Sequence, residues 1–335
     1  MGSGDWNDGM NRVGHLGLGE SVWLGFFLHA VLTQFAPLAE QRGEEAFAKR
    51  CLTIAGELGV QLEKHAWDGQ WYRRAYFDDG APLGSAADAE CRIDSLPQSW
   101  ATIAGVGAPE RRGLALDSMW AELVHEDLRL VQLFTPPFAH SAVDPGYIKG
   151  YPPGVRENAG QYTHGAVWAA LALALAGRSE QAATLVSLLN PINHALDPQA
   201  VERYKVEPYV LAADVYSQPP YAGRGGWTWY TGSAAWLYRL LHEVILGVHR
   251  QGDTLHLQPQ VPPSWTQFKL HYRYYQTFYH LVFTQAPTHQ GPARLVLDGQ
   301  PVPDGGLKLI NDQREHSVEV LFGPTAWRES QAGVT

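Results

Sequence analysis

The chain has 335 residues, of which 45% are hydrophobic and 18% are charged. This globular composition leaves room for one large domain and a small one. A net charge of −9 without a basic stripe argues against nucleic acid as a partner. Two cysteines, Cys51 and Cys91, are too few for a disulfide framework, which suits a reducing compartment.

Targeting and membrane signals are sparse in the sequence. The nearest approach to a membrane span, residues 166–176, is only eleven residues long. No signal-peptide pattern is present either, so we expect the fragment to be cytoplasmic. The chain opens directly on its most site-like segment, and we therefore expect residues to be missing upstream.

Hydrophobic periodicity predicts a mainly helical N-terminal part. Helices are expected over residues 21–38, where Pro37 marks the end, and over 44–65, 95–104, 109–126, 162–176, 179–189 and 232–246. Residues 71–77 are predicted to be extended, and 207–215 to form a shorter helical element. The irregular section 134–161 carries five prolines and ends in a polar cluster, so we expect it to be functional.

After residue 247 the hydrophobic period changes to two. Strict alternation over 268–274 predicts a strand, and further strands are expected at 255–257, 279–283, 295–297 and 318–322. We therefore predict a helical domain over residues 1–250 that carries the site, and a small antiparallel β domain over 251–335. Buried and amphipathic helices joined by long polar loops indicate an α/α toroid with a site at one rim.

Three glycine-rich polar loops each precede a helix, at residues 4–14, 151–165 and 223–233. The first contains Asp5, Trp6, Asn7 and Asp8. A sugar site needs hydrogen-bond partners for hydroxyls, an aromatic face, and a carboxylic acid that can protonate a leaving oxygen. A solvated Asx-turn loop explains the same residues and stays open as an alternative.

The third loop leads into Thr231-Gly232-Ser233 at the start of a helix, where free backbone N–H groups can hold an anion such as phosphate. His164 and Arg12 could supply further donors or positive charge. The simpler interpretations are that Thr231 caps its helix and that His164 is a hydrogen-bonded core histidine.

The acids that lie among aromatics and glycines are Asp5, Asp8, Glu157 and Glu207. Inverting glycosidic cleavage requires a protonated acid at the leaving oxygen and a nucleophile on the opposite face. A hydrolase activates water with a second carboxylate, whereas a phosphorylase uses inorganic phosphate and needs no protein base. One acid with an anion pocket fits the phosphorylase. We expect no metal and no cofactor, because ligand-spaced His/Cys pairs and nucleotide motifs are missing.

Five long motifs carry a family resemblance: GDWNDGMN at 4–11, GESVWL at 19–24, GYPPGVREN at 150–158, VERYKVEPY at 201–209 and TGSAAW at 231–236. Together they resemble the inverting glycoside phosphorylases of family 94, the cellobiose phosphorylase group. The motifs GYPPGVREN and VERYKVEPY look like the C-terminal phosphorylase region of cyclic β-1,2-glucan synthases. The resemblance covers nearly the whole chain.

The resemblance implies an (α/α)6 barrel followed by a β-sheet domain, and it implies roles for particular residues. Asp8 becomes the general acid. The residues that contact the sugar become Trp6, Asn7, Glu157 and Glu207. The residues that hold phosphate become Arg12, His164, Thr231 and Gly232.

Family members carry a β-sandwich and further barrel helices before the Asp-Trp-Asn-Asp motif. This chain shows about eight helical segments instead of twelve, so the resemblance implies an incomplete barrel. An incomplete barrel leaves an apolar edge exposed, and we expect the chain to self-associate over that edge.

The implied function is cleavage of β-1,2-glucosidic bonds in a β-glucan oligosaccharide. Inorganic phosphate is the co-substrate, α-glucose 1-phosphate is the product, and the reaction controls glucan chain length. The parent protein is expected in the bacterial inner membrane, with its catalytic regions facing the cytoplasm. Two alternatives stay open: a truncated, non-catalytic glucan-binding fragment, and an inverting β-glucan hydrolase that uses Glu157 or Glu207 as base.

Overall fold

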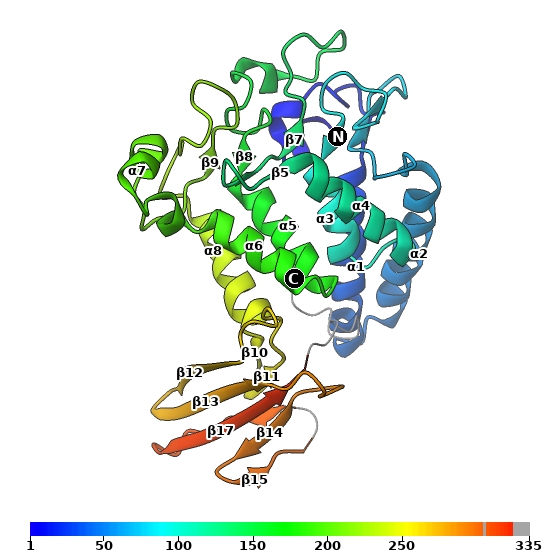
Figure 1. The fold of residues 1–335 in the computed structure, drawn as a ribbon. Helices are drawn as coiled ribbons and strands as arrows, with labels where there is room; N and C mark the ends of the chain where they lie inside the picture. Colours follow the sequence, from blue (N-terminus) through cyan, green and yellow to red (C-terminus); the bar gives the residue numbers. More distant parts are fainter. Residues whose placement is uncertain (304–305, 324–335) are drawn as a thin grey trace. The chain divides into compact units, whose positions relative to one another are not determined.

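The computed structural model describes residues 1–303 and 306–323, and the chain divides into two compact units (Figure 1). The first unit comprises Met1–Ala172 and Leu185–Trp236. The second comprises Leu173–Thr184 and the chain from Leu237 onward. The domain boundary near residue 250 stays a prediction; the first strand of the β region, β10 (Val248–Gln251), begins just before it.

The predicted helices are present, with small shifts at their ends. They are α1 (Val22–Gln41), α2 (Glu45–His65), α3 (Ser95–Ile103), α4 (Pro109–Leu123), α5 (Thr163–Leu175) and α6 (Ser179–Leu189). Helix α1 packs against α2 and α3, and α3 packs against α4. The chain is therefore mainly helical up to its C-terminal β region, as predicted.

Polar residues at the loop ends explain where α1 and α3 begin. The Ser21 hydroxyl accepts a hydrogen bond from the Leu24 amide at the start of α1 (3.2 Å), and the Asp94 carboxylate accepts one from the Leu96 amide at the start of α3 (2.8 Å). Such caps satisfy amides that have no partner inside the helix. Both helices therefore start at the side of the domain where the polar loops lie.

Pro37 does not end α1, and this prediction was wrong. The helix continues to Gln41, although Pro37 cannot donate the usual backbone hydrogen bond. On either side of Pro37, Ala36 and Ala39 are buried against Ala48 and Cys51 of α2. This close packing outweighs the local preference of proline.

The prediction of a helical element at 207–215 was also wrong. The helix in this region, α7 (Pro198–Tyr204), lies earlier in the chain. It begins there because the Asp197 carboxylate accepts a hydrogen bond from the Ala200 amide and Pro198 suits the first turn. Residues 207–215 form turns and the short strand β9 (Asp214–Val215). The last predicted helix begins at Thr231 as α8 (Thr231–Arg239) and continues as a π-helical turn over Leu240–Ile245.

Short strand pairs hold the long loops of the first unit. The segment predicted to be extended at 71–77 contributes only β2 (Ala75–Tyr76), which lies between β1 (Glu20–Ser21) and β3 (Pro82–Leu83). The other pairs are β4 (Ile93–Asp94) with β7 (Phe134–Thr135), β5 (Val124–His125) with β6 (Leu130–Val131), and β8 (Gln161–Tyr162) with β9. Figure 1 shows β5, β7, β8 and β9 at one end of the helices.

A cluster of indoles forms the core beneath this end. Trp23 of α1, Trp100 of α3 and Trp168 of α5 are almost fully buried. The ring centroids of Trp100 and Trp168 are 5.2 Å apart, and those of Trp23 and Trp168 are 6.1 Å apart. Edge-to-face and offset-stacked rings are favourable geometries for such pairs. The three helices are thus joined near their N-termini, directly below the polar loops.

Helix α1 is long and apolar enough to cross a membrane by length and composition, with a mean hydropathy of 1.5. The expectation that no stretch approaches a span more closely than residues 166–176 was therefore wrong. Only about a third of its most apolar stretch is buried. Large apolar side chains are exposed along it, namely Leu24, Phe27, Leu28, Val31, Phe35 and Leu38.

The second unit contains the predicted strands in two sheets (Figure 1). The three-stranded sheet has the order β10–β11–β16, with β11 (Thr254–Leu257) and β16 (Leu307–Lys308). The five-stranded sheet has the order β12–β13–β17–β14–β15, with β12 (Gln267–Tyr274), β13 (Thr277–Gln285), β14 (Arg294–Leu297), β15 (Gln300–Pro301) and β17 (Glu315–Phe322).

The larger sheet is mixed, so the prediction of a purely antiparallel domain was wrong in part. Strand β17 pairs parallel to β13 and antiparallel to β14. The chain leaves β13, forms the β14–β15 hairpin at the edge, and returns between β13 and β14. Alternation within single strands predicts burial but does not reveal this order.

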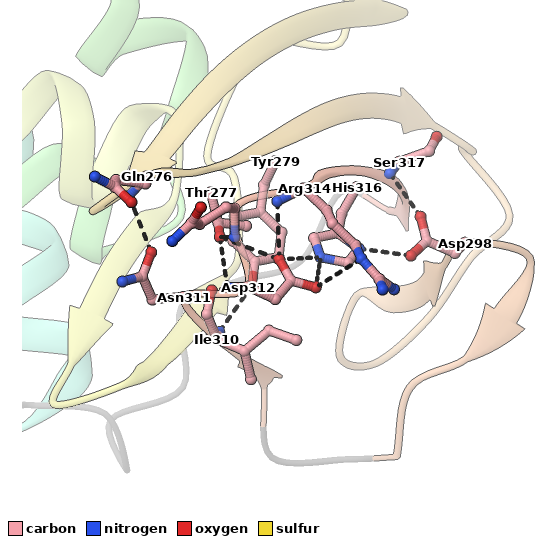
Figure 2. Close-up of polar contacts among 11 residues, drawn as sticks. Gln276, Thr277, Tyr279, Asp298, Ile310, Asn311, Asp312, Arg314, His316 and Ser317 are labelled. Atoms are coloured by element: carbon pink, nitrogen blue, oxygen red, sulfur yellow. Dashed lines mark hydrogen bonds and ion pairs between the residues drawn. The ribbon is translucent and has the colours of Figure 1, made fainter.

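A polar cluster ties together the loops at one end of this sheet (Figure 2). His316 of β17 is held between two carboxylates, with Nδ1 2.7 Å from Asp298 and Nε2 3.2 Å from Asp312. Its ring stacks on Tyr279, and Asp312 also accepts hydrogen bonds from Thr277 and the Arg314 amide. The cluster therefore joins the β14–β15 turn, the segment before β17 and the start of β13.

We predict that this cluster makes the sheet less stable as the pH rises. The Asp298 hydrogen bond, with help from Asp312, raises the pKa of His316. The protonated ring therefore contributes fully below its unfolded pKa of about 6.5, and this contribution is lost as the pH rises through the higher folded value. Hydrogen exchange of the β17 amides should accelerate from pH 6 to pH 8 more in the wild type than in His316→Gln, after correction for intrinsic rates. Equal pH dependence in both proteins would contradict the prediction.

Candidate active site

The first polar loop ends in a 3₁₀ turn, Asp8–Met10, that presents Asp8 to solvent. Its neighbours Asn7 and Met10 are completely buried and anchor the turn. The Asp5 carboxylate accepts hydrogen bonds from the Asn7 amide (2.9 Å) and the Ser21 hydroxyl (2.5 Å). Asp8 is thus a surface carboxyl on a loop that is fixed from below.

A buried ion triad lies under this loop. The Arg74 guanidinium pairs with Asp5 and, through Nε, with Asp94 at 3.1 Å, and all three side chains are fully buried. Although burial favours the neutral form of Asp5, the Arg74 charge holds the pKa of Asp5 below its ordinary value. Burial raises the pKa of Asp94 to about 6. Since Ser21 and Asp94 cap α1 and α3, the triad connects two helix ends to the Asp8 loop.

The irregular section contributes Tyr147, which lies near Asp8. Burial, and after it the neighbouring Asp8 carboxylate, raise the pKa of Tyr147. Two backbone contacts hold the loops together: the Arg12 amide donates to the Pro145 carbonyl, and the Tyr147 amide donates to the Asn11 side chain, both at 3.2 Å. The structure therefore places a tyrosine near the expected acid.

Arg156 and Glu157 come from the second polar loop. The Arg156 guanidinium lies between the rings of Tyr151 (5.2 Å) and Trp227 (5.6 Å), and its Nε is 3.4 Å from the Glu157 carboxylate. Burial raises the pKa of Glu157, and the charges of Asp214 and Asp8 add to this effect. Glu157 and Asp8 are thus close enough to interact, as a shared sugar site requires.

Asp214, which the sequence did not single out, joins the second and third polar loops. It is buried and accepts hydrogen bonds from the amides of Trp227 (3.0 Å) and Arg156 (3.3 Å). A Cβ at position 226 would collide with its carboxylate, so Gly226 is required there. Burial raises the pKa of Asp214.

His164 lies in an aromatic cage at the start of α5. Its ring is 4.4 Å from that of Trp168, 5.5 Å from that of Trp6 and 6.1 Å from that of Trp236. Burial lowers the pKa of His164 to about 4, so the ring is neutral near pH 7. Its Nε2 atom is buried and has no hydrogen-bond partner in the part of the chain that the structure describes. His164 was expected to supply positive charge or a hydrogen-bond donor. The neutral ring supplies no charge but can donate one hydrogen bond.

The start of α8 lies beside this ring. A Cβ at Gly232 would come within 3.9 Å of His164 Nδ1. Thr231 and Gly232 are exposed in the first turn, and the buried Ser233 hydroxyl has no hydrogen-bond partner among the described residues. The structure therefore brings His164 together with Thr231 and Gly232 at the start of α8, where free backbone amides can hold an anion.

Two predicted residues make other contacts. Arg12 forms an exposed ion pair with Asp144 at 2.9 Å, so a phosphate contact would require this pair to open. Glu207 lies at a separate corner, where Trp229 Nε1 donates a hydrogen bond to it at 3.3 Å.

The two remaining predicted residues, Asn7 and Trp6, belong to the first loop. Asn7 is completely buried, and both polar atoms of its amide lack hydrogen-bond partners among the described residues. Trp6 is half-buried, with its ring edge-to-face to that of Tyr162 at 5.2 Å.

Sequence reasoning missed Tyr147, Arg156, Asp214 and the Arg74–Asp94 part of the triad. The proline-rich section that carries Tyr147 was marked as functional, but its spacing did not select that residue. Among the residues that the structure describes, no group of three or more His, Cys, Asp or Glu side chains is arranged to hold a metal ion.

The fold and this site are those of a carbohydrate-active enzyme. The chain belongs to the Glycosyl hydrolase 94 superfamily, because the model of its catalytic domain matches residues 1–247. Over 81% of its length it is 52% identical to the cyclic beta-(1,2)-glucan synthase NdvB of Rhizobium meliloti (strain 1021), and the match covers 10% of that protein.

A second relative is the solabiose phosphorylase of Paenibacillus borealis, with 31% identity over 95% of the chain and 41% of that protein. The chain therefore spans a tenth and about two fifths of these two relatives. A solved sialidase shares the fold alone, with a TM-score of 0.51 and 14% identity over 81% of this chain and 24% of the sialidase. These relatives are thus a cyclic β-1,2-glucan synthase and a glycoside phosphorylase, both longer than this chain.

Proposed function

We propose that the chain is the phosphorylase region of a cyclic β-1,2-glucan synthase and cleaves β-1,2-glucosidic bonds with inorganic phosphate. The observation that carries the proposal is the neutral His164 ring, whose Nδ1 lies beside the start of α8 and whose buried Nε2 has no hydrogen-bond partner among the described residues. A hydrolase would need a carboxylate at the nucleophile position, whereas a helix end with neutral donors suits a phosphate anion. The likeness to the synthase supports the β-1,2 linkage.

In this mechanism Asp8 donates its proton to the bridging glycosidic oxygen as the bond to the anomeric carbon breaks. Phosphate, held by His164, Thr231 and Gly232, attacks that carbon from the opposite face. The products are α-glucose 1-phosphate and a glucan shortened by one unit, with the configuration inverted.

The experiment that tests the proposal is the release of glucose 1-phosphate from linear β-1,2-glucan, with and without phosphate. Release that depends on phosphate would support it. An inverting hydrolase is the second candidate, because Glu157 is close enough to Asp8 for their charges to interact. The Oε2 atom of Glu157 also has no hydrogen-bond partner among the residues that the structure describes. Glucose release at a rate independent of phosphate would favour that hydrolase. Binding of glucan without any cleavage would favour the non-catalytic fragment.

The proposal includes the setting of the enzyme. We place the helices in an (α/α)6 barrel, supported by the pairing of α1 with α2 and of α3 with α4. The reaction would set glucan chain length within a parent protein anchored in the bacterial inner membrane, with this region on the cytoplasmic side. Protease accessibility of this region in inside-out vesicles, compared with right-side-out vesicles, tests the orientation.

Self-association is a further part of the proposal, and the apolar face of α1 supports it. Six large apolar side chains of α1 are at least a third exposed, and such continuous patches mark association surfaces. We expect the protein to be oligomeric by light scattering at micromolar concentration. The double substitution Leu28→Glu and Phe35→Glu should make it monomeric, whereas Val60→Glu, on α2, should have a smaller effect. A monomeric wild-type protein would contradict this prediction.

A further inference from the structure

Two aromatic rings, those of Tyr209 and Trp229, are exposed between α7 and α8, and Trp229 comes shortly before Thr231 in the chain. The side chains of Tyr209 and Trp229 are 73% and 66% exposed. Their ring centroids are 6.4 Å apart and their planes are inclined by 70°. The two rings thus form an open corner with two apolar faces. Exposed aromatic surface of this kind is typical of ligand contacts.

The backbone holds Trp229 in an unfavourable conformation. Its φ of 65° lies in the left-handed region, which bulky residues rarely adopt. Such strain costs free energy and is found mainly at functional sites. Because the ring is exposed, packing contacts within this chain do not offset the free energy of this backbone conformation. The conformation is explained if the ring is presented to a ligand.

The polar group in the corner is Glu207. It accepts a hydrogen bond from Trp229 Nε1 at 3.3 Å, and its backbone amide, Thr228 and Trp229 lower the pKa of Glu207. An ionised carboxylate accepts hydrogen bonds from hydroxyl groups and repels phosphate or nucleic acid. Aromatic faces beside a hydroxyl acceptor match the apolar face and equatorial hydroxyls of a pyranose ring.

The corner lies on the same segment as residues of the proposed site. Trp227 packs against the Arg156 guanidinium, 5.6 Å from the centre of the ring. Trp229 follows it closely on the same segment. A glucan chain that occupies the site can therefore continue along this segment to the corner.

We propose that Tyr209, Trp229 and Glu207 form an outlying subsite that binds one glucosyl residue of a linear β-glucan, beyond the residues that react. This inference rests on the proposed function for the identity of the sugar. The subsite contributes affinity for long glucan chains and is not used by a disaccharide. It would therefore favour polymer over disaccharide as substrate.

Gel electrophoresis through linear β-1,2-glucan tests the binding without requiring any reaction. Trp229→Gly is the main variant, since glycine removes the ring and adopts φ of 65° without strain, so the fold is kept. Tyr209→Ala is the second variant. The matched control is Tyr275→Ala, whose ring is 71% exposed and also lies edge-to-face to a neighbouring ring, that of Tyr274.

We expect the glucan to retard the wild-type protein and the Tyr275→Ala control equally. Trp229→Gly and Tyr209→Ala should each weaken the affinity roughly threefold to tenfold, the usual scale of one aromatic contact. Equal retardation of Trp229→Gly and wild type would overturn the proposal, as would a wild-type protein that glucan does not retard.

Kinetics then separate the subsite from the reaction centre. Where phosphorolysis is observed, Trp229→Gly should raise KM for long glucan and leave kcat and the KM for the β-1,2-linked disaccharide unchanged. Equal losses on both substrates would overturn the proposal, because they would place Trp229 at the reaction centre. If phosphorolysis is absent but retardation still depends on Trp229, the proposed function fails and the subsite stands.

Discussion

Replacing Asp8 by Asn should reduce phosphorolysis roughly 10²- to 10⁴-fold, because an amide cannot protonate the bridging oxygen. Asp8 is exposed on its turn, and Asn has nearly the same size and shape. The turn is fixed by Asn7, Met10 and Asp5, so the substitution should leave the fold unchanged. The measurement is kcat/KM for linear β-1,2-glucan with saturating phosphate.

Asp127→Asn is the matched control for this substitution. Asp127 is an exposed turn residue at the β5–β6 hairpin and has no role in the proposed site. It should retain the wild-type rate. Asp8→Asn should also be less impaired in the forward direction with a dinitrophenyl β-glucoside and phosphate, because dinitrophenolate leaves without a proton. Wild-type phosphorolysis by Asp8→Asn would show that another group is the acid.

Replacing Arg74 by Met should lower the free energy of unfolding by about 3–5 kcal/mol, because it leaves the carboxylates of Asp5 and Asp94 buried together without a cation. All three side chains are fully buried. The adjacent Arg73→Met is the matched control: Arg73 is partly exposed, and its partner Asp68 keeps hydrogen bonds from Ser85 and Ala86. Urea unfolding monitored by tryptophan fluorescence compares the two.

The triple variant Asp5→Asn, Arg74→Met, Asp94→Asn distinguishes charge from packing. It removes the uncompensated carboxylates, so it should recover part of the stability that Arg74→Met loses. If Arg74→Met costs no more than Arg73→Met, the triad does not hold the Asp8 loop in the way that its geometry indicates.

Local sequence patterns were enough to predict most helices and strands, because apolar periodicity and capping residues act within one element. They failed where contacts between elements determine where a helix ends or which strands pair. Pro37 stays helical because Ala36 and Ala39 pack against α2. The parallel β13–β17 pair depends on where the chain returns to the sheet, which alternation along a strand does not encode.

The candidate site was predictable as three loops and not as a set of contacts. Thr231, Gly232 and His164 were selected, and the structure places His164 beside the start of α8. The neutral state of His164 depends on burial among Trp168 of the same helix and two indoles that are distant in sequence, Trp6 and Trp236. The position of Arg74 under the Asp8 loop likewise depends on the pairing of β1 with β2. Neither feature leaves a spacing signal in the sequence.

The central claim is that Asp8 and a bound phosphate act on opposite faces of the anomeric carbon. The most direct measurement is the configuration of the first-formed glucose 1-phosphate, read from the anomeric proton coupling by NMR in a reaction with linear β-1,2-glucan and phosphate. The account predicts the α-anomer. The β-anomer, or free glucose formed at the same rate without phosphate, would contradict it.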